Sequence, residues 1–109
     1  MATQAEVNGI FPAMVENFNA DKASGVNTTI QFNLKGDNGG MYWVKINDGS
    51  VEHGEGDVDA GMIVEATADD FYAISTGNMN PMQAYMMGKI KATDIGMAMK
   101  MIQIFGLGS

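Results

Sequence analysis

Apolar and polar side chains alternate through the middle of the chain. In residues 28–34 (TTIQFNL), Ile30, Phe32 and Leu34 point to one side and the polar residues between them to the other. This period of two is typical of a strand with one buried face. The sequence predicts five such strands, at residues 28–34, 41–47, 50–53, 62–66 and 89–93. Because short turn signals such as Asp48-Gly49 join consecutive strands, the pattern indicates an antiparallel meander.

Helical spacing replaces alternation toward both ends of the chain. Thr3 and Glu6 have the spacing of a capping box, and apolar residues follow them at helical intervals. Pro12 predicts a break in this stretch, because proline lacks the N–H that a helix interior needs. Thr67 and Asn80, the latter followed by a proline, predict the starts of two further helices.

The last predicted helix, residues 94–105, is more apolar than a helix on a sheet needs to be. At 100° per residue its apolar side chains cover an arc of about 220°, whereas about 100° is enough to cover a core. The excess must face a second helix, another subunit or a bound molecule, and periodicity does not choose among them. Seven of the eleven methionines lie between Met79 and Met101. Methionine adapts its shape readily, which favours an adaptable surface, with an ordinary methionine-rich core as the alternative.

The charge of the chain argues against nucleic acid as a partner. The 109 residues fit one domain spanning 1–109, and 46% of them are apolar, which is enough for a core. Six lysines and no arginine oppose thirteen acidic residues, which gives a net charge of −7. A polyanion would be repelled, and the same field limits contact with an anionic membrane to a transient one.

Residues that usually carry chemistry are sparse. The chain has no cysteine, no apolar run of membrane length and no signal-peptide pattern, so a cytoplasmic location is expected. His53 lies among acidic residues, but the segment Asp57-x-Asp59-x-Gly61 lacks the glutamate that completes a calcium loop. No nucleophile elbow or phosphate-binding loop is present. We therefore expect no metal, no cofactor and no catalytic residue.

Six segments of the chain carry distinctive motifs. They are residues 30–32 (IQF), 39–43 (GGMYW), 46–49 (INDG), 67–71 (TADDF), 80–91 (NPMQAYMMGKIK) and 94–100 (DIGMAMK). In this order they resemble the sterol carrier protein family, also called non-specific lipid-transfer proteins, in its free-standing prokaryotic form. The likeness runs from about residue 5 to residue 105. Tyr85 stands where the family more often has phenylalanine, and Thr93 where it usually has glycine.

The resemblance implies an α+β fold, in which a five-stranded, mainly antiparallel sheet carries helices on one face and an apolar tunnel runs between them. It also implies a carrier rather than an enzyme, which sequesters fatty acids, fatty acyl-CoAs or other apolar lipids such as sterols. On this interpretation the residues expected to contact lipid are Phe32, Trp43, Phe71, Ile74, Met82, Tyr85, Met86, Ile95, Met99, Ile102 and Phe105.

Two lysines are candidates for binding a lipid head group. Lys89 and Lys91 lie two residues apart on one side of the last predicted strand, where they could pair with a carboxylate or a phosphate. The simpler interpretation is that they keep an edge strand from associating with other strands.

Two other functions stay open on the sequence alone. The apolar excess of residues 94–105 would also suit a dimerisation or interaction module with no guest. A small α+β domain could instead process acyl thioesters, although the chain shows no obvious base for that reaction. The carrier interpretation predicts a monomer or a weak dimer.

Overall fold

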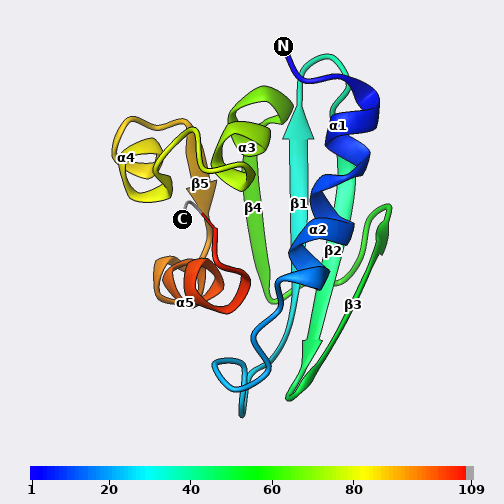
Figure 1. The fold of residues 1–109 in the computed structure, drawn as a ribbon, viewed down its shortest axis with the longest axis vertical. Helices are drawn as coiled ribbons and strands as arrows, with labels where there is room; N and C mark the ends of the chain where they lie inside the picture. Colours follow the sequence, from blue (N-terminus) through cyan, green and yellow to red (C-terminus); the bar gives the residue numbers. More distant parts are fainter. Residues whose placement is uncertain (108–109) are drawn as a thin grey trace.

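The computed structural model describes residues 1–107, and a five-stranded sheet lies at its centre (Figure 1). Its strands are β1 (Asn27–Lys35), β2 (Gly40–Asn47), β3 (Ser50–Glu55), β4 (Met62–Thr67) and β5 (Ile90–Ala92). All five predicted strands are present, in the spatial order β3-β2-β1-β4-β5. The inward residues are those that the alternation predicts, since Ile30, Phe32, Tyr42 and Val44 are all buried.

The sheet is mixed, so the predicted meander is wrong at one connection. β1 runs antiparallel to β2 but parallel to β4, while β2–β3 and β4–β5 are antiparallel pairs. Instead of turning back beside β3, residues 56–61 cross the sheet and bring β4 against β1. Gln31 of β1 holds this crossing, because its side-chain oxygen accepts from the Val58 N–H (2.8 Å) and its nitrogen donates to the Gly56 carbonyl (3.1 Å). Gln31 points away from the inward face, yet the crossing leaves it only 2% exposed.

Five helices in the described chain accompany the sheet. They are α1 (Gln4–Asn8), α2 (Ile10–Glu16), α3 (Ala68–Ser75), α4 (Pro81–Met86) and α5 (Ile95–Phe105). Figure 1 shows α1 and α2 in front of β1 and β2, with α3, α4 and α5 on the side of β4 and β5. The predicted caps are confirmed, because the side chains of Thr3, Thr67, Asn80 and Asp94 each accept a hydrogen bond from the first helical turn that follows.

The first helical stretch breaks at Gly9, not at Pro12 as the sequence predicts. Gly9 closes α1 and opens α2. Pro12 is the third residue of α2, where a backbone N–H has no partner inside the helix. Proline therefore removes no helical hydrogen bond at this position, and α2 continues through it.

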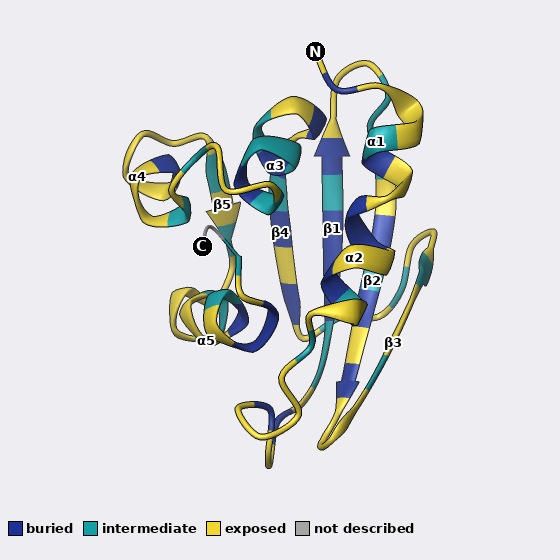
Figure 2. Ribbon diagram, in the orientation of Figure 1, coloured by how far each residue is buried: buried dark blue, intermediate teal, exposed yellow. Residues whose placement is uncertain are grey.

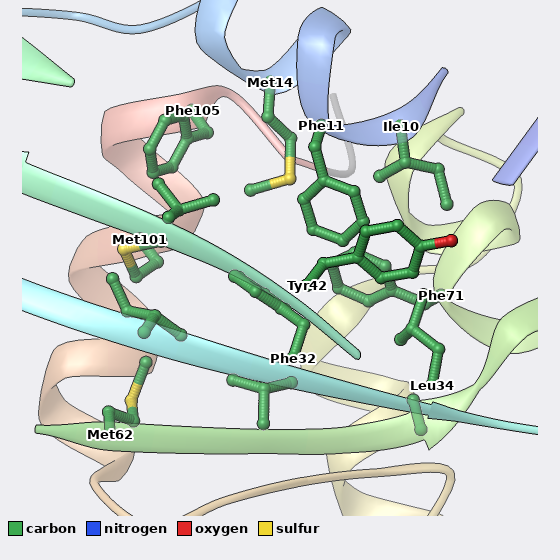
Figure 3. Packing of buried hydrophobic residues seen from close by; sticks show 14 of the residues in the cluster. Ile10, Phe11, Met14, Phe32, Leu34, Tyr42, Met62, Phe71, Met101 and Phe105 are labelled. Carbon is green, nitrogen blue, oxygen red and sulfur yellow. The ribbon is translucent and has the colours of Figure 1, made fainter. Parts of the chain in front are cut away.

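An aromatic cluster joins the amino-terminal helices to the sheet. The Phe11 ring of α2 stacks on Tyr42 with centroids 4.6 Å apart, and meets Phe32 edge-on at 5.2 Å. Phe71 of α3 lies 5.3 Å from Phe32, so two helices and two strands share one contact (Figure 3). Figure 2 shows that the buried residues lie where the helices and the sheet face each other, whereas the outer turns of α4 and α5 are exposed.

Candidate lipid-binding site

A cavity lies between the sheet and helices α3, α4 and α5. Inward-facing residues of β1, β4 and β5 form its floor, because alternate side chains of a strand share one face. One side of each of the three helices forms its walls. The cap residues Thr67, Asn80 and Asp94 fix where these helices begin.

The lining of the cavity is almost entirely apolar. The phenol of Tyr85 is the one polar side-chain group other than methionine sulfur among the lining residues of the described chain. Among residues 1–107, no carboxylate, imidazole or ammonium group lines the cavity. The site can therefore exclude water from a hydrocarbon chain.

The cavity is narrow, with a volume of about 60 Å³. An apolar cavity that accommodates benzene measures about 150 Å³, so this space is too small for a lipid chain as it stands. Part of its wall reaches the surface, because Met82, Tyr85, Ile95 and Met99 line the cavity and are also exposed. A flexible, surface-reaching wall can widen without disturbing the sheet. The continuous tunnel that the resemblance implies stays a prediction.

Most of the residues predicted to contact lipid come together at this cavity. Those that line it are Phe32, Phe71, Ile74, Met82, Tyr85, Ile95, Met99 and Ile102. They come from β1, α3, α4 and α5, which are far apart in the chain. The over-wide apolar arc of the last helix is explained in part, because Ile95, Met99 and Ile102 all face this space.

Three of the predicted residues lie elsewhere. Trp43 sits on the opposite face of the sheet, because its neighbours Tyr42 and Val44 point inward. Its ring covers Gly54 of β3 so closely that a Cβ at Gly54 would collide with it. The expectation that Trp43 faces the cavity is therefore wrong, and alternation along β2 is the physical reason.

The other two misplaced residues belong to helices. Met86 lies on the outer side of α4 and is 80% exposed. Phe105 is buried, but it turns toward Phe18, with ring centroids 5.7 Å apart, rather than toward the cavity. Neither residue lines the cavity. Helical periodicity identifies the apolar residues of a helix, but it does not show which of them face the cavity.

Eight lining residues were not predicted as lipid contacts. They are Met62, Val64, Pro81, Ile90, Ala92, Ala98, Met101 and Leu107. Several carried a usable signal, because Ile90 and Ala92 alternate with the lysines of the last strand and must face the same side as each other. The sequence did not show that β4 contributes residues to the cavity floor. Its position beside β1 depends on residues 56–61 crossing the sheet.

The two candidate head-group lysines lie away from the cavity. Lys91 pairs in register with Glu65 of β4, and both side chains are on the face opposite Ile90 and Ala92. Lys89 and Lys91 border a shallow polar depression that also includes Lys35 and Glu65. Lys35 makes an exposed ion pair with Glu65 at 2.9 Å and, with Lys91 contributing less, lowers the pKa of that carboxyl. Their setting favours a role on the sheet surface.

A second hollow runs between α1, α2 and α3 and measures about 340 Å³. It is partly polar, with Glu6, Asn17, Tyr72, Ser75 and Thr76 among its lining residues. Leu107 lines both this hollow and the apolar cavity, and so separates the two.

Comparison with known sequences settles the family. The profile of the SCP-2 sterol transfer family matches residues 9–106. The chain belongs to the SCP-2 sterol transfer family. The mixed five-stranded sheet with its helices is therefore the fold of this family, and a lipid-binding and transfer role comes with it.

Two relatives extend the comparison beyond the family profile. Hydroxysteroid dehydrogenase-like protein 2 of Xenopus laevis is 31% identical over 99 residues, a match that spans 88% of this SCP-2 chain. The chain spans only 24% of that relative's length. The solution structure of palmitated SCP2L2 from Aedes aegypti superimposes with a TM-score of 0.71 at 22% identity, and covers 96% of this chain and 95% of the other.

An enzyme also contains this fold. A stereoselective inverting sec-alkylsulfatase from Pseudomonas sp. superimposes with a TM-score of 0.70 at 21% identity. The match covers 86% of the SCP-2 chain but only 15% of the sulfatase, so the likeness is confined to a small part of the larger protein. Within residues 1–107 of the SCP-2 chain, no three His, Asp or Glu side chains converge as metal ligands. None of the described helices has the length and apolar character to cross a bilayer.

Proposed function

We propose that this protein is a non-catalytic carrier that holds the hydrocarbon chain of a fatty acid, a fatty acyl-CoA or another apolar lipid in the cavity between the sheet and α3, α4 and α5. The observation that supports this most directly is the uncharged, apolar lining of that cavity. The palmitated Aedes aegypti structure supports an acyl chain as the guest, since the two folds superimpose over nearly their whole lengths.

The energetics of burial favour loose selectivity. Each methylene removed from water contributes about 0.8 kcal/mol, so a sixteen-carbon chain gains roughly 10 kcal/mol before ordering costs. A single hydrogen bond, such as one to the Tyr85 hydroxyl, adds about 1 kcal/mol. Chain length therefore outweighs head-group chemistry at this site, and lipids with different polar ends bind in the same cavity.

The cavity widens when lipid enters. Its present volume of about 60 Å³ is well below the 300 Å³ or more of an ordinary ligand pocket. Met82 and Met99 are unbranched and reach the surface, so new rotamers of these side chains open space at low cost. The floor on the sheet stays fixed, because strand residues such as Phe32 and Val64 are buried.

Filling the cavity tests the proposal directly. Ala98→Leu adds three heavy atoms to the wall of the cavity, whereas Gln103→Leu places a leucine on the exposed side of the same helix. We expect Ala98→Leu to weaken binding of a fluorescent fatty acid at least tenfold and to raise the free energy of unfolding by about 1 kcal/mol, since a void is filled. Gln103→Leu should bind as the native chain does. Equal binding by both variants would place the lipid elsewhere.

Native mass spectrometry separates the carrier from the two alternative functions. The carrier is expected as a monomer that retains lipid mass after purification. A stable empty dimer would instead favour an interaction module. An acyl-thioester enzyme would turn over acyl-CoA, although in the described part of the chain no carboxylate lines the cavity to serve as its base.

Charge reversal tests the two lysines separately. Because Lys89 and Lys91 lie on the opposite face of the sheet, the double change to Glu should leave acyl-CoA affinity unchanged across a range of salt concentrations. A loss of affinity that disappears at high salt would return them to the head-group role.

A further inference from the structure

The polar hollow between α1, α2 and α3 has the size of a binding site. Its volume of about 340 Å³ is within the range of ordinary ligand pockets, whereas the apolar cavity of about 60 Å³ is below that range. The buried side chains of Ile10, Met14 and Phe105 form its apolar base (Figure 3). The polar side chains that line it are those of Glu6, Asn17, Tyr72, Ser75 and Thr76. The hollow therefore combines an apolar base with a polar wall.

Leu107 stands between this hollow and the apolar cavity, and no other residue of the described chain lines both. Its N–H donates to the Ile102 carbonyl at 3.0 Å, directly after Gly106, which ends α5 in the left-handed conformation (φ 63°). This pattern fixes the backbone of Leu107. Its half-buried side chain keeps its choice of rotamers, so the turn of one leucine side chain connects the two spaces.

Hydrogen bonds within the polar wall leave it rich in acceptors. The Ser75 hydroxyl donates to the Tyr72 carbonyl at 2.8 Å, and the Thr76 hydroxyl donates to the same carbonyl at 3.0 Å. The Tyr72 phenol donates to the Glu6 carboxylate. Because these hydroxyl protons are already engaged, the oxygens of Ser75, Tyr72 and Glu6 can only accept a hydrogen bond from a guest.

The charge of Glu6 restricts the guest further. In the part of the chain that the structure describes, neither a lysine nor the histidine lines the hollow. A carboxylate or a phosphate would therefore approach Glu6 with no positive side chain beside it, and like charges at short distance repel. A hydroxyl group supplies the proton that the acceptors need, and it lacks the strong hydration of an ammonium group.

We propose that this hollow holds the head group of the lipid guest, and that it favours an uncharged head with hydroxyl groups, such as that of a monoacylglycerol, over a carboxylate or a phosphate. This inference rests on the proposed carrier function. The acyl chain lies in the widened cavity, the Leu107 side chain turns aside, and the head-group hydroxyls donate to Ser75 and Glu6. Burial of the chain still supplies most of the affinity, and the hollow adds a severalfold preference among lipids of equal chain length.

Titration calorimetry of the full chain with monolauroylglycerol and laurate at pH 8 tests the role of charge. The native chain should bind monolauroylglycerol at least fivefold more tightly than laurate. Glu6→Gln should bind laurate at least threefold more tightly than the native chain does, and monolauroylglycerol within twofold of it. Glutamine also completes a capping box, so α1 keeps its cap. The matched control is Glu16→Gln, which removes an exposed carboxylate of α2 outside the hollow and should bind both lipids as the native chain does.

Two further variants test occupancy of the hollow. Ser75→Ala removes an acceptor and should weaken monolauroylglycerol binding about threefold without changing laurate binding. Ala13→Trp fills the hollow from α2 and should weaken monolauroylglycerol binding at least fivefold. Ala20→Trp adds the same bulk at an exposed position outside the hollow and should bind as the native chain does.

The possible failures are distinct. If the native chain binds both lipids equally, or if Glu6→Gln and Glu16→Gln change laurate binding equally, the head-group inference is wrong and the carrier function stands. A preference that survives in Glu6→Gln but disappears in Tyr85→Phe would place the head group beside α4, and the inference also fails. Binding of neither lipid by the native chain would remove the carrier function itself.

Discussion

Glu6 and Tyr72 join the first helix to α3 across the polar hollow. One carboxylate oxygen of Glu6 accepts from the Thr3 N–H at 2.9 Å and completes the capping box of α1. This backbone hydrogen bond, together with one from the Tyr72 hydroxyl, lowers the pKa of Glu6. The same hydrogen bond to Glu6, with a smaller contribution from burial, raises the pKa of Tyr72. The pair therefore couples a helix cap to the packing of two helices.

Tyr72→Phe should raise the pKa of Glu6, because it removes one of the hydrogen bonds that favour the carboxylate. A lowered carboxyl pKa stabilises the fold above the ordinary carboxyl pKa, and this contribution is lost as pH falls through the pKa of folded Glu6. The stability difference between Tyr72→Phe and the native chain should thus be largest near neutral pH and disappear in acid. Carbon NMR titration of the Glu6 carboxyl is the measurement, and Tyr85→Phe is the control. An unchanged Glu6 titration in Tyr72→Phe would contradict the assignment.

Gln31 and Asn33 form a matched pair on the outer face of β1. The Gln31 amide satisfies backbone groups of Tyr42, Gly56 and Val58, whereas the Asn33 side-chain oxygen is buried with no hydrogen-bond partner in the described chain. Gln31→Leu should destabilise the fold by about 2–4 kcal/mol in urea unfolding, because it leaves buried backbone groups unpaired. Asn33→Leu should be neutral or stabilising. Equal losses in both variants would argue against a special role for Gln31.

At the scale of elements, local sequence signals predict where helices and strands lie along the chain. They do not predict which strands are neighbours in the sheet. Helix starts at Thr67, Asn80 and Asp94 were predictable, because a cap is a contact within one turn. Strand alternation was equally local. The pairing of β1 with β4 was not predictable, since it depends on residues 56–61 crossing the sheet on hydrogen bonds to a distant glutamine. A six-residue connection between strands looks the same in the sequence whether it turns back or crosses over.

The candidate site follows the same division. The apolar arc of α5 and the capped helix at Phe71 identified much of the cavity wall, because helical periodicity fixes which residues share a side. Periodicity does not show which side of α4 faces the sheet. Met86 was therefore predicted to face the cavity, although it is exposed to solvent. The volume of the cavity depends on how side chains from six elements interdigitate, which no local pattern records.

Replacing methionines of the cavity wall with leucine should narrow the range of lipids without changing the fold. Met82→Leu with Met99→Leu keeps volume and hydrophobicity nearly constant but removes conformational freedom. We expect the free energy of unfolding to change by less than about 1.5 kcal/mol and the spread of affinities across straight-chain and sterol-like lipids to increase. Met41→Leu, on the far face of the sheet, serves as the control. Unchanged affinities across the lipid panel would count against an adaptable wall.

At the scale of the whole molecule, loading should stabilise the fold in proportion to chain length. A ligand that binds only the folded state, present at 100 times its Kd, contributes about 2.7 kcal/mol. For a chain of this size that corresponds to an increase in Tm of roughly 10 °C. In a thermal scan the increase should grow from eight-carbon to sixteen-carbon fatty acids at equal concentration, and it should be smaller in Ala98→Leu. An increase that is independent of chain length would indicate binding through the head group.

The position of the single tryptophan gives the molecule a built-in optical reference. Trp43 lies over Gly54 with the thickness of the sheet between its indole and the cavity. Its fluorescence emission should therefore change when β2 and β3 separate during unfolding. The emission should stay constant when the cavity takes up a lipid. Urea should shift the emission maximum to longer wavelength, whereas saturation with palmitate should leave maximum and intensity unaltered. Spectroscopic titrations of this carrier consequently require an extrinsic dye or a labelled lipid, with the native indole as the constant against which that signal is normalised.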